Sequence, residues 1–188
     1  MSAMSMLLVG IGIAMGGIAA EAAEKPEVQP YLRTGSQYVK QRNYQQAMGE
    51  FQKALEADPE SVAANAGMGN LYAGMKQCTQ GIPYLEKALR IDPNDDTALF
   101  GLGACYMDLQ QHEHAIPYLQ KALHIRPDNR AATRALADAY VRRGVVAHDR
   151  GQPQQAKTAL QAALKLFQQL GDQQGIDDMT RALNEMPK

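Results

Sequence analysis

From residue 28 onward, apolar and small residues recur at spacings that place them on one face of a helix. Tyr31, Gly35 and Tyr38 follow the i, i+4, i+7 spacing of such a face. After a polar break, a second stripe with similar spacing follows: Ala47, Phe51, Ala54 and Leu55. The dipeptide Asp58-Pro59 then ends the pattern, because proline disfavours helical geometry in the residue before it. The pattern predicts a hairpin of two helices joined by a short turn.

The same hairpin pattern returns at one fixed spacing, the repeat interval, which is the distance along the chain from Tyr38 to Tyr72. Residues of four types recur at this interval: Tyr38, Tyr72, Tyr106 and Tyr140; Pro59, Pro93 and Pro127; Gly35, Gly69 and Gly103; Ala54, Ala88 and Ala122. A period of about 20–50 residues is typical of proteins that stack copies of one small unit. The chain has no long alternating run of β-branched residues of the kind that forms a sheet. We therefore expect an all-α protein.

The third unit shows the repeated pattern most completely, with Leu102, Gly103, Tyr106, Ala115, Leu119, Ala122 and Pro127. With these residues the chain resembles the tetratricopeptide repeat family, whose unit is a helix–turn–helix. The resemblance implies an α-α superhelix, or solenoid, with repeats at about 28–61, 62–95 and 96–129. Asn65 and Leu99 depart from the family pattern, which has an aromatic residue early in the unit, as Tyr31 is here.

The fourth repeat, at about 130–170, breaks the interval. Ala137 and Tyr140 keep it, but the second stripe comes seven residues late, at Ala156, Leu160 and Ala163. Because seven residues are close to two helical turns, this insertion preserves the apolar face. The elements expected here are a long first helix over about 130–150, a turn at 151–153, and a capping helix over about 173–186 that ends the repeat domain at 28–188.

Residues 1–27 are of a different kind, with no charged side chain before Glu21. Residues 6–20 are apolar or glycine throughout, and Ala20-Glu21-Ala22 has the form of a signal-peptide cleavage site. No basic residue precedes this stretch, and it is at the short end for a transmembrane helix. Three interpretations stay open: an export signal, a retained membrane anchor, or a disordered or spurious tail. The first predicts an exported, periplasmic or cell-envelope protein, and the second an inner-membrane tether.

Composition and the absence of known motifs argue against nucleic-acid binding and against catalysis. Lys and Arg number 19 and Asp and Glu number 20, so no basic surface for nucleic acid is expected. No nucleophile elbow, phosphate loop or zinc-protease motif is present, and we expect neither an enzyme nor a cofactor. His112, Glu113 and His114 are the strongest candidates for a metal site. Since the sequence supplies no further ligands beside them, solvated turn residues are the preferred interpretation.

Two cysteines, Cys78 and Cys105, fall in the turn of the second unit and late in the first helix of the third. In stacked hairpins these two places lie at the same end, so the two side chains could meet. A disulfide is allowed if the chain is exported. Unpaired thiols are the preferred alternative, because sequence does not supply the required Cα separation of about 4.4–6.8 Å.

The resemblance also implies where a partner binds, because in this family the residues next to the packing stripe of each first helix line a concave groove. The corresponding residues are Leu32, Ser36, Val39, Asn70, Ala73, Phe100, Ala104, Met107, Arg134 and Asp138. Members that clamp the terminal carboxylate of a chaperone use Lys, Arg and Asn there, and only Asn70 matches. We expect a largely apolar groove that suits an amphipathic helix or extended peptide. The alternative is that these residues pack on neighbouring helices and leave no continuous groove.

These features favour a non-enzymatic scaffold that binds a protein partner. By analogy with short arrays of this family behind an apolar N-terminal segment, it would be an assembly or adaptor factor in the bacterial cell envelope. An alternative is a self-assembling homo-oligomer, in which capped ends stack or the groove takes the N-terminal segment of another copy. A metal-binding or enzymatic role at His112, Glu113 and His114 is a third hypothesis.

Overall fold

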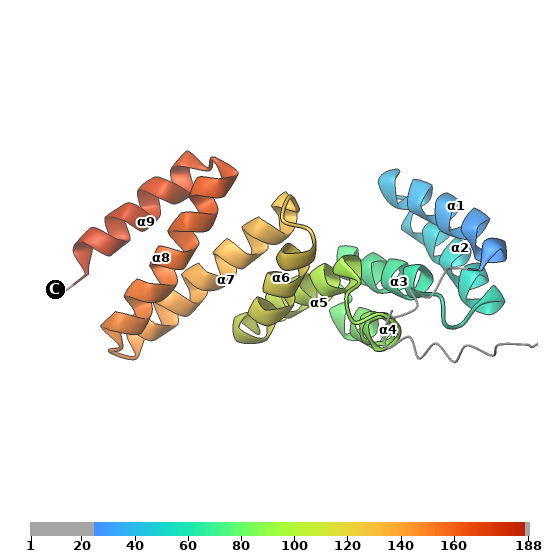
Figure 1. The fold of residues 1–188 in the computed structure, drawn as a ribbon, viewed down its shortest axis with the longest axis horizontal. Coiled ribbons are helices and arrows are strands. Elements are labelled where there is room, and N and C mark those ends of the chain that lie inside the picture. Colours follow the sequence, from blue (N-terminus) through green and yellow to red (C-terminus); the bar gives the residue numbers. More distant parts are fainter. Residues whose placement is uncertain (1–24, 187–188) are drawn as a thin grey trace, which may run out of the picture.

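The computed structural model describes residues 25–186, and within these residues every regular element is a helix. A short 3-10 helix, η1 (Pro26–Val28), comes first. The α-helices that follow are α1 (Gln29–Lys40), α2 (Tyr44–Ala57), α3 (Val62–Gly74), α4 (Cys78–Ile91), α5 (Asp96–Asp108), α6 (His112–Ile125), α7 (Arg130–Asp149), α8 (Pro153–Leu170) and α9 (Gln173–Glu185). Consecutive helices pair as hairpins, and the hairpins stack along one axis (Figure 1). The predicted all-α superhelix is confirmed.

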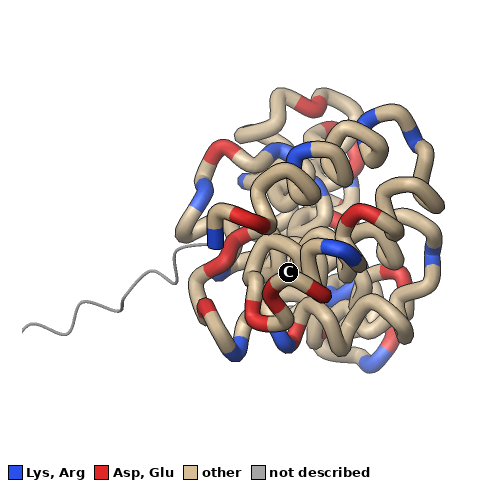
Figure 2. The backbone as a smooth tube through the Cα atoms, turned by 90° about the vertical axis from the view of Figure 1, so that its right-hand side faces the viewer, with Lys and Arg blue, Asp and Glu red and all other residues tan. Residues whose placement is uncertain are grey.

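The expected export signal or membrane anchor, at residues 6–20, lies outside the described residues. Among the helices of residues 25–186, none combines the length and apolar character needed to cross a bilayer. Viewed along the long axis, acidic and basic residues are interspersed around the superhelix (Figure 2). This mixture agrees with the nearly balanced charge of the sequence.

Each first helix after α1 begins at a capping side chain. Ser61 Oγ, Asp95 Oδ1 and Asn129 Oδ1 accept hydrogen bonds from the backbone N–H three residues later, at 3.1, 2.6 and 3.1 Å. Such a bond satisfies one of the backbone donors that have no partner at the start of a helix. These caps keep the repeat interval, so the same local chemistry starts three successive units.

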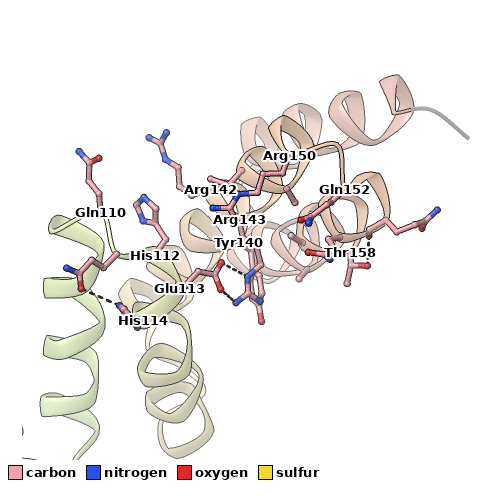
Figure 3. Close-up of a pocket in the computed structure, with 17 residues that line it drawn as sticks. Gln110, His112, Glu113, His114, Tyr140, Arg142, Arg143, Arg150, Gln152 and Thr158 are labelled. Carbon is pink, nitrogen blue, oxygen red and sulfur yellow. Dashed lines mark hydrogen bonds and ion pairs between the residues drawn. The ribbon is translucent and has the colours of Figure 1, made fainter.

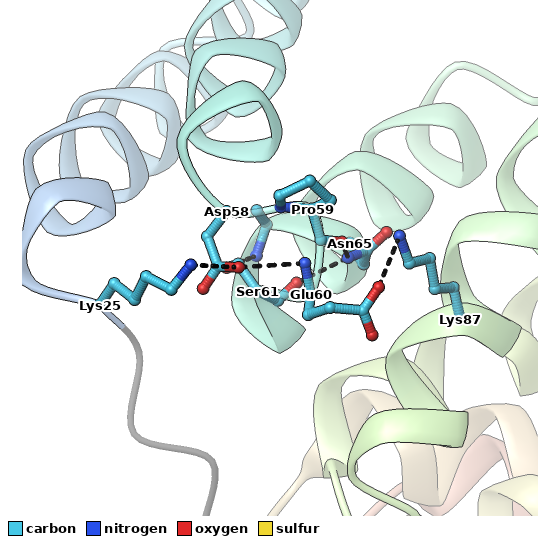
Figure 4. A network of polar contacts seen from close by, with 8 residues as sticks. Lys25, Asp58, Pro59, Glu60, Ser61, Asn65 and Lys87 are labelled. Carbon is cyan, nitrogen blue, oxygen red and sulfur yellow. Dashed lines mark hydrogen bonds and ion pairs between the residues drawn. The ribbon is translucent and has the colours of Figure 1, made fainter.

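Asn65, which departs from the aromatic pattern, has a structural role at the junction of the first two units (Figure 4). Its side chain is 1% exposed and donates hydrogen bonds to the carbonyls of Pro59 and Ser61, at 3.1 and 2.7 Å. Asp58 caps the same turn by accepting from the Glu60 N–H at 3.2 Å. A buried amide thus replaces an aromatic ring by satisfying the carbonyls of the Asp-Pro turn.

Bulky residues of the second helices join neighbouring units. Leu85 on α4 is fully buried between Gly69 of its own hairpin and Gly101 of the next. A Cβ atom added at Gly69 would lie 2.5 Å from Leu85 Cγ, which is closer than real side chains approach. Phe51 occupies the same place between Gly35 and Gly67. Each glycine pair therefore makes room for the side chain that connects two units.

The long helix α7 follows two overlapping repeat registers: its first half keeps the repeat interval, and its second half follows the interval shifted by seven residues. Its first half packs on α6 through Ala132, Leu136 and Ala139, which lie one repeat interval after Ala98, Leu102 and Cys105. Its second half pairs with α8 through Gly144, which lies under Leu160 as Gly103 lies under Leu119. Counted from Gly103, this glycine comes seven residues later than the repeat interval predicts.

The turn that follows α7 keeps the shifted register. The earlier hairpin turns each contain a residue with φ near 60°, namely Arg42, Lys76 and Gln110, which follow one another at the repeat interval. The next such residue is Gly151, again seven residues later than this interval predicts. Tyr140 packs against the cores on both sides, since it belongs to the first register and precedes the second. The α7–α8 hairpin consequently extends about 10 Å, or two helical turns, past the α5–α6 turn.

Candidate functional site

The first helices of the hairpins line one continuous concave groove of about 1240 Å³. Most of its lining comes from α1, α3, α5 and α7, with Phe51 of α2 and His112 of α6 added. Apolar residues occur along its whole length, and Val39, Ala73, Phe100, Met107 and Val141 are among them. Charged residues line its ends and edges: Lys40, Lys76, Asp108, Asp138 and Arg142. Such a surface can hold an apolar segment of a partner and leave polar flanks in water.

Eight of the ten predicted residues line this groove: Ser36, Val39, Asn70, Ala73, Phe100, Ala104, Met107 and Asp138. Leu32 lies outside it, because its side chain packs into the core with Phe51. Arg134 also lies outside, since it forms an ion pair with Asp172 and lies 5.4 Å from the ring centroid of Phe167. The two-turn shift of α8 brings Phe167, at the end of that helix, and Asp172, just after it, close to Arg134. The predicted groove thus begins at Ser36 and does not include Arg134.

Polar contacts fix the relative positions of the groove walls. Asn70 Nδ2 donates to the carbonyls of Ala66 and Thr97, at 2.9 and 3.2 Å, and so connects α3 to α5. Lys76 Nζ lies 2.8 Å from Asp108 Oδ1, and this pair joins the turn after α3 to the end of α5 at the edge of the groove. The hydrogen bond to Asp108 raises the pKa of Lys76. The walls are therefore held in place before any partner binds.

The two cysteines meet beside the groove without lining it. Cys78 begins α4 and Cys105 lies in α5; both are buried free thiols in one core cluster, and Cys78 Sγ donates to Asp108 Oδ2 at 3.9 Å. Burial raises the pKa of both thiols, and the neighbouring Cys78 raises that of Cys105 further. Protonated, buried thiols react slowly. A disulfide between them stays the less favoured of the two alternatives stated from the sequence.

The residues of the metal hypothesis begin α6 and diverge. Glu113 pairs with the guanidinium of Arg143, whose Nε lies 2.8 Å from Oε1. His114 Nδ1 lies 3.3 Å from Gln111 Oε1, and His112 Nδ1 is buried without a hydrogen-bond partner. Across residues 25–186, no three His, Cys, Asp or Glu side chains are arranged to hold a metal.

These residues instead line a second cleft of about 980 Å³ (Figure 3). The α5–α6 turn forms one side of this cleft, and the projecting end of the α7–α8 hairpin forms the other. Arg142 and Arg143 on α7, and Arg150 directly after that helix, line it too. This arginine cluster is not among the residues predicted from the sequence. Its signal was the seven-residue spacing of Arg143 and Arg150, which is close to two helical turns and keeps both on one side of the chain.

The fold is similar to several solved structures. PilF of Pseudomonas aeruginosa is 23% identical, with 84% of this chain and 69% of that chain covered and a TM-score of 0.63. MamA from Desulfovibrio magneticus RS-1 is 25% identical over 78% of this chain and 77% of that chain, with a TM-score of 0.61. The first repeat domain of Spaghetti, bound to an HSP90 peptide, is 23% identical over 65% and 95%, with a TM-score of 0.56.

No curated protein is significantly similar to the chain in sequence. Models of the tetratricopeptide repeat match residues 32–74, 62–95, 97–129 and 137–170. The last match begins at Ala137, seven residues inside α7, and follows the shifted register of its second half. Because these matches together cover more than half of the sequence and agree with the observed hairpins, the chain belongs to the tetratricopeptide repeat family.

Proposed function

We propose that the protein is a non-catalytic interaction scaffold that holds an apolar segment of another protein in its concave groove. The observation that carries this proposal is the continuous apolar lining across α1, α3, α5 and α7. The family is in general a protein-interaction module, and a structural neighbour, Spaghetti, binds an HSP90 peptide. The occupant is an amphipathic helix or an extended strand that places apolar side chains against Phe100 and Met107.

The groove favours such a segment over the terminal carboxylate that some family members clamp. Phe100 and Ala104 occupy places where clamping members have charged or amide side chains, and neither can pair with a carboxylate. The Asn70 amide, the remaining match, already donates to two backbone carbonyls. A carboxylate buried here would lose its hydration without gaining partners.

Carboxylates introduced on the groove floor test the proposal. Phe100→Glu and Met107→Glu should each weaken capture of cross-linked partners from producing cells at least about tenfold, because the apolar segment would bury an unpaired charge. Val145→Glu is the matched control, since Val145 is apolar, 47% exposed and outside the groove lining. The measurement is the yield of each partner by quantitative mass spectrometry.

Retention of every partner by both groove variants would contradict the proposal. Recovery of a second copy of the chain alone, with a mass in light scattering that rises with concentration, would also contradict it. The protein would then be a self-assembling scaffold.

We propose further that the scaffold acts as an assembly or adaptor factor in the bacterial cell envelope, exported or tethered through residues 6–20. The uncharged apolar segment and the Ala20-Glu21-Ala22 site support export or tethering, and the assembly or adaptor role rests on analogy with short arrays of this family. Alkaline phosphatase fused after residue 27 should be active in a bacterial host, because the enzyme forms its disulfides only after export. An inactive fusion in the cytoplasmic fraction would contradict the export proposal.

A further inference from the structure

The second cleft has an excess of positive charge. Arg142, Arg143 and Arg150 line it, and Glu113 is the acidic residue among its lining. Arg143 is already paired with Glu113, whereas Arg142 and Arg150 are exposed and form no ion pair with any residue of 25–186. Both guanidinium groups are therefore available to an anionic ligand. Arginine suits this task because its planar fork binds a carboxylate through two parallel hydrogen bonds.

An unsatisfied polar atom lies in the same cleft. His112 Nδ1 is buried and has no hydrogen-bond partner within the described chain. Burial and the neighbouring Arg142 lower the pKa of this imidazole. A buried polar atom without a partner costs free energy.

The cleft is continuous with the concave groove. Gln110, His112 and Arg142 line both spaces. A segment lying in the apolar groove can thus pass these three residues and enter the cleft without leaving the protein surface. The volume, about 980 Å³, is at the upper end of the range for specific ligand pockets.

We propose that the cleft binds an acidic stretch of the same partner segment whose apolar part lies in the groove. This inference rests on the proposed function and adds the chemistry of the partner. Aspartate or glutamate side chains of that stretch form charge-assisted hydrogen bonds with Arg142 and Arg150. The ligand is therefore bipartite, with apolar residues for the groove next to acidic residues for the cleft.

A random peptide display library panned against purified protein tests the proposal. Four proteins are compared: the unmodified chain, the cleft variant Arg142→Gln with Arg150→Gln, the groove variant Phe100→Gln with Met107→Gln, and a charge control, Arg33→Gln with Arg90→Gln. The control removes the same charge from exposed positions on α1 and α4 that line neither space. Circular dichroism checks that all four are folded.

The unmodified chain and the charge control should select peptides in which Asp and Glu adjoin apolar residues. The cleft variant should lose the acidic preference and keep the apolar one, and it should bind a resynthesised bipartite peptide about tenfold more weakly. The groove variant should lose the apolar preference and keep the acidic one. Raising the salt concentration should weaken peptide binding to the unmodified chain far more than binding to the cleft variant.

The arms separate the two proposals. If the cleft variant keeps the acidic preference, the cleft inference is overturned and the groove proposal stands. If the groove variant keeps the apolar preference, the proposed function fails while the cleft can still bind acidic residues. Failure of the unmodified chain to select any peptide overturns both.

Discussion

Replacing Leu85 by alanine is expected to lower the free energy of unfolding by about 2–5 kcal/mol, the range for truncating a fully buried leucine. The side chain is 0% exposed and lies between Gly69 of one hairpin and Gly101 of the next. Its loss leaves a cavity at the junction of two units. The helices α3, α4 and α5 could fill this cavity only by shifting toward one another, which would disturb their other contacts. Since whole domains are stable by only about 5–15 kcal/mol, the effect is large.

Urea denaturation followed by circular dichroism measures this loss. Leu109→Ala is the matched control, because Leu109 is 37% exposed at the end of α5 and should change stability by no more than about 0.5 kcal/mol. In a stacked-repeat protein, a cavity at one junction also weakens the coupling between units, so the transition should broaden. Equal losses for the two variants would show that Leu85 does not connect the units in this way.

Deleting residues 137–143 is expected to give a folded protein with four regular units. The deletion joins Leu136 to Gly144, which recreates the Leu102-Gly103 pair of the third unit. It shortens α7 from 20 residues to 13, the length of α3 and α5. Seven residues are nearly two helical turns, so the packing faces on either side of the deletion stay aligned to within about 20°.

A deletion of five residues, 137–141, is the control for this prediction. It turns the second half of α7 by about 140° and places Gly144 away from Leu160. The seven-residue deletion should keep the helical circular dichroism per residue and one cooperative thermal transition. The five-residue deletion should lose the structure of α8 and α9 and expose them to proteolysis. Similar behaviour of the two variants would contradict the assignment of two overlapping registers to α7.

The fold could be predicted because the same packing requirement recurs at a fixed interval. Gly103 must be small under Leu119, and Pro127 must end a helix, so those positions admit few residue types. The seven-residue shift in the fourth repeat could be recognised because the same small and apolar residue types recur there at a changed spacing. The sequence did not show that Tyr140 packs against the cores on both sides, because that depends on which helix each half of α7 contacts.

The groove could be predicted only where helix geometry alone sets the direction of a side chain. Phe100, Ala104 and Met107 lie in the middle of the superhelix and line the groove as expected. Leu32 lies at the end of the array, where no preceding hairpin covers the core, and its side chain fills that space. The arginine cleft exists because one hairpin projects past another. The spacing of Arg143 and Arg150 places them on one side of the chain, but no local pattern shows that the α5–α6 turn lies opposite them.

The central claim is that a partner segment lies along the floor of the concave groove, and photo-cross-linking tests it most directly. A benzophenone side chain at Ala104, on the groove lining, is compared with one at Thr79, an exposed position on α4 outside that lining. Irradiation in producing cells should link the partner to position 104 and leave position 79 unlinked. Cross-linking of the partner at position 79 with none at position 104 would contradict the account.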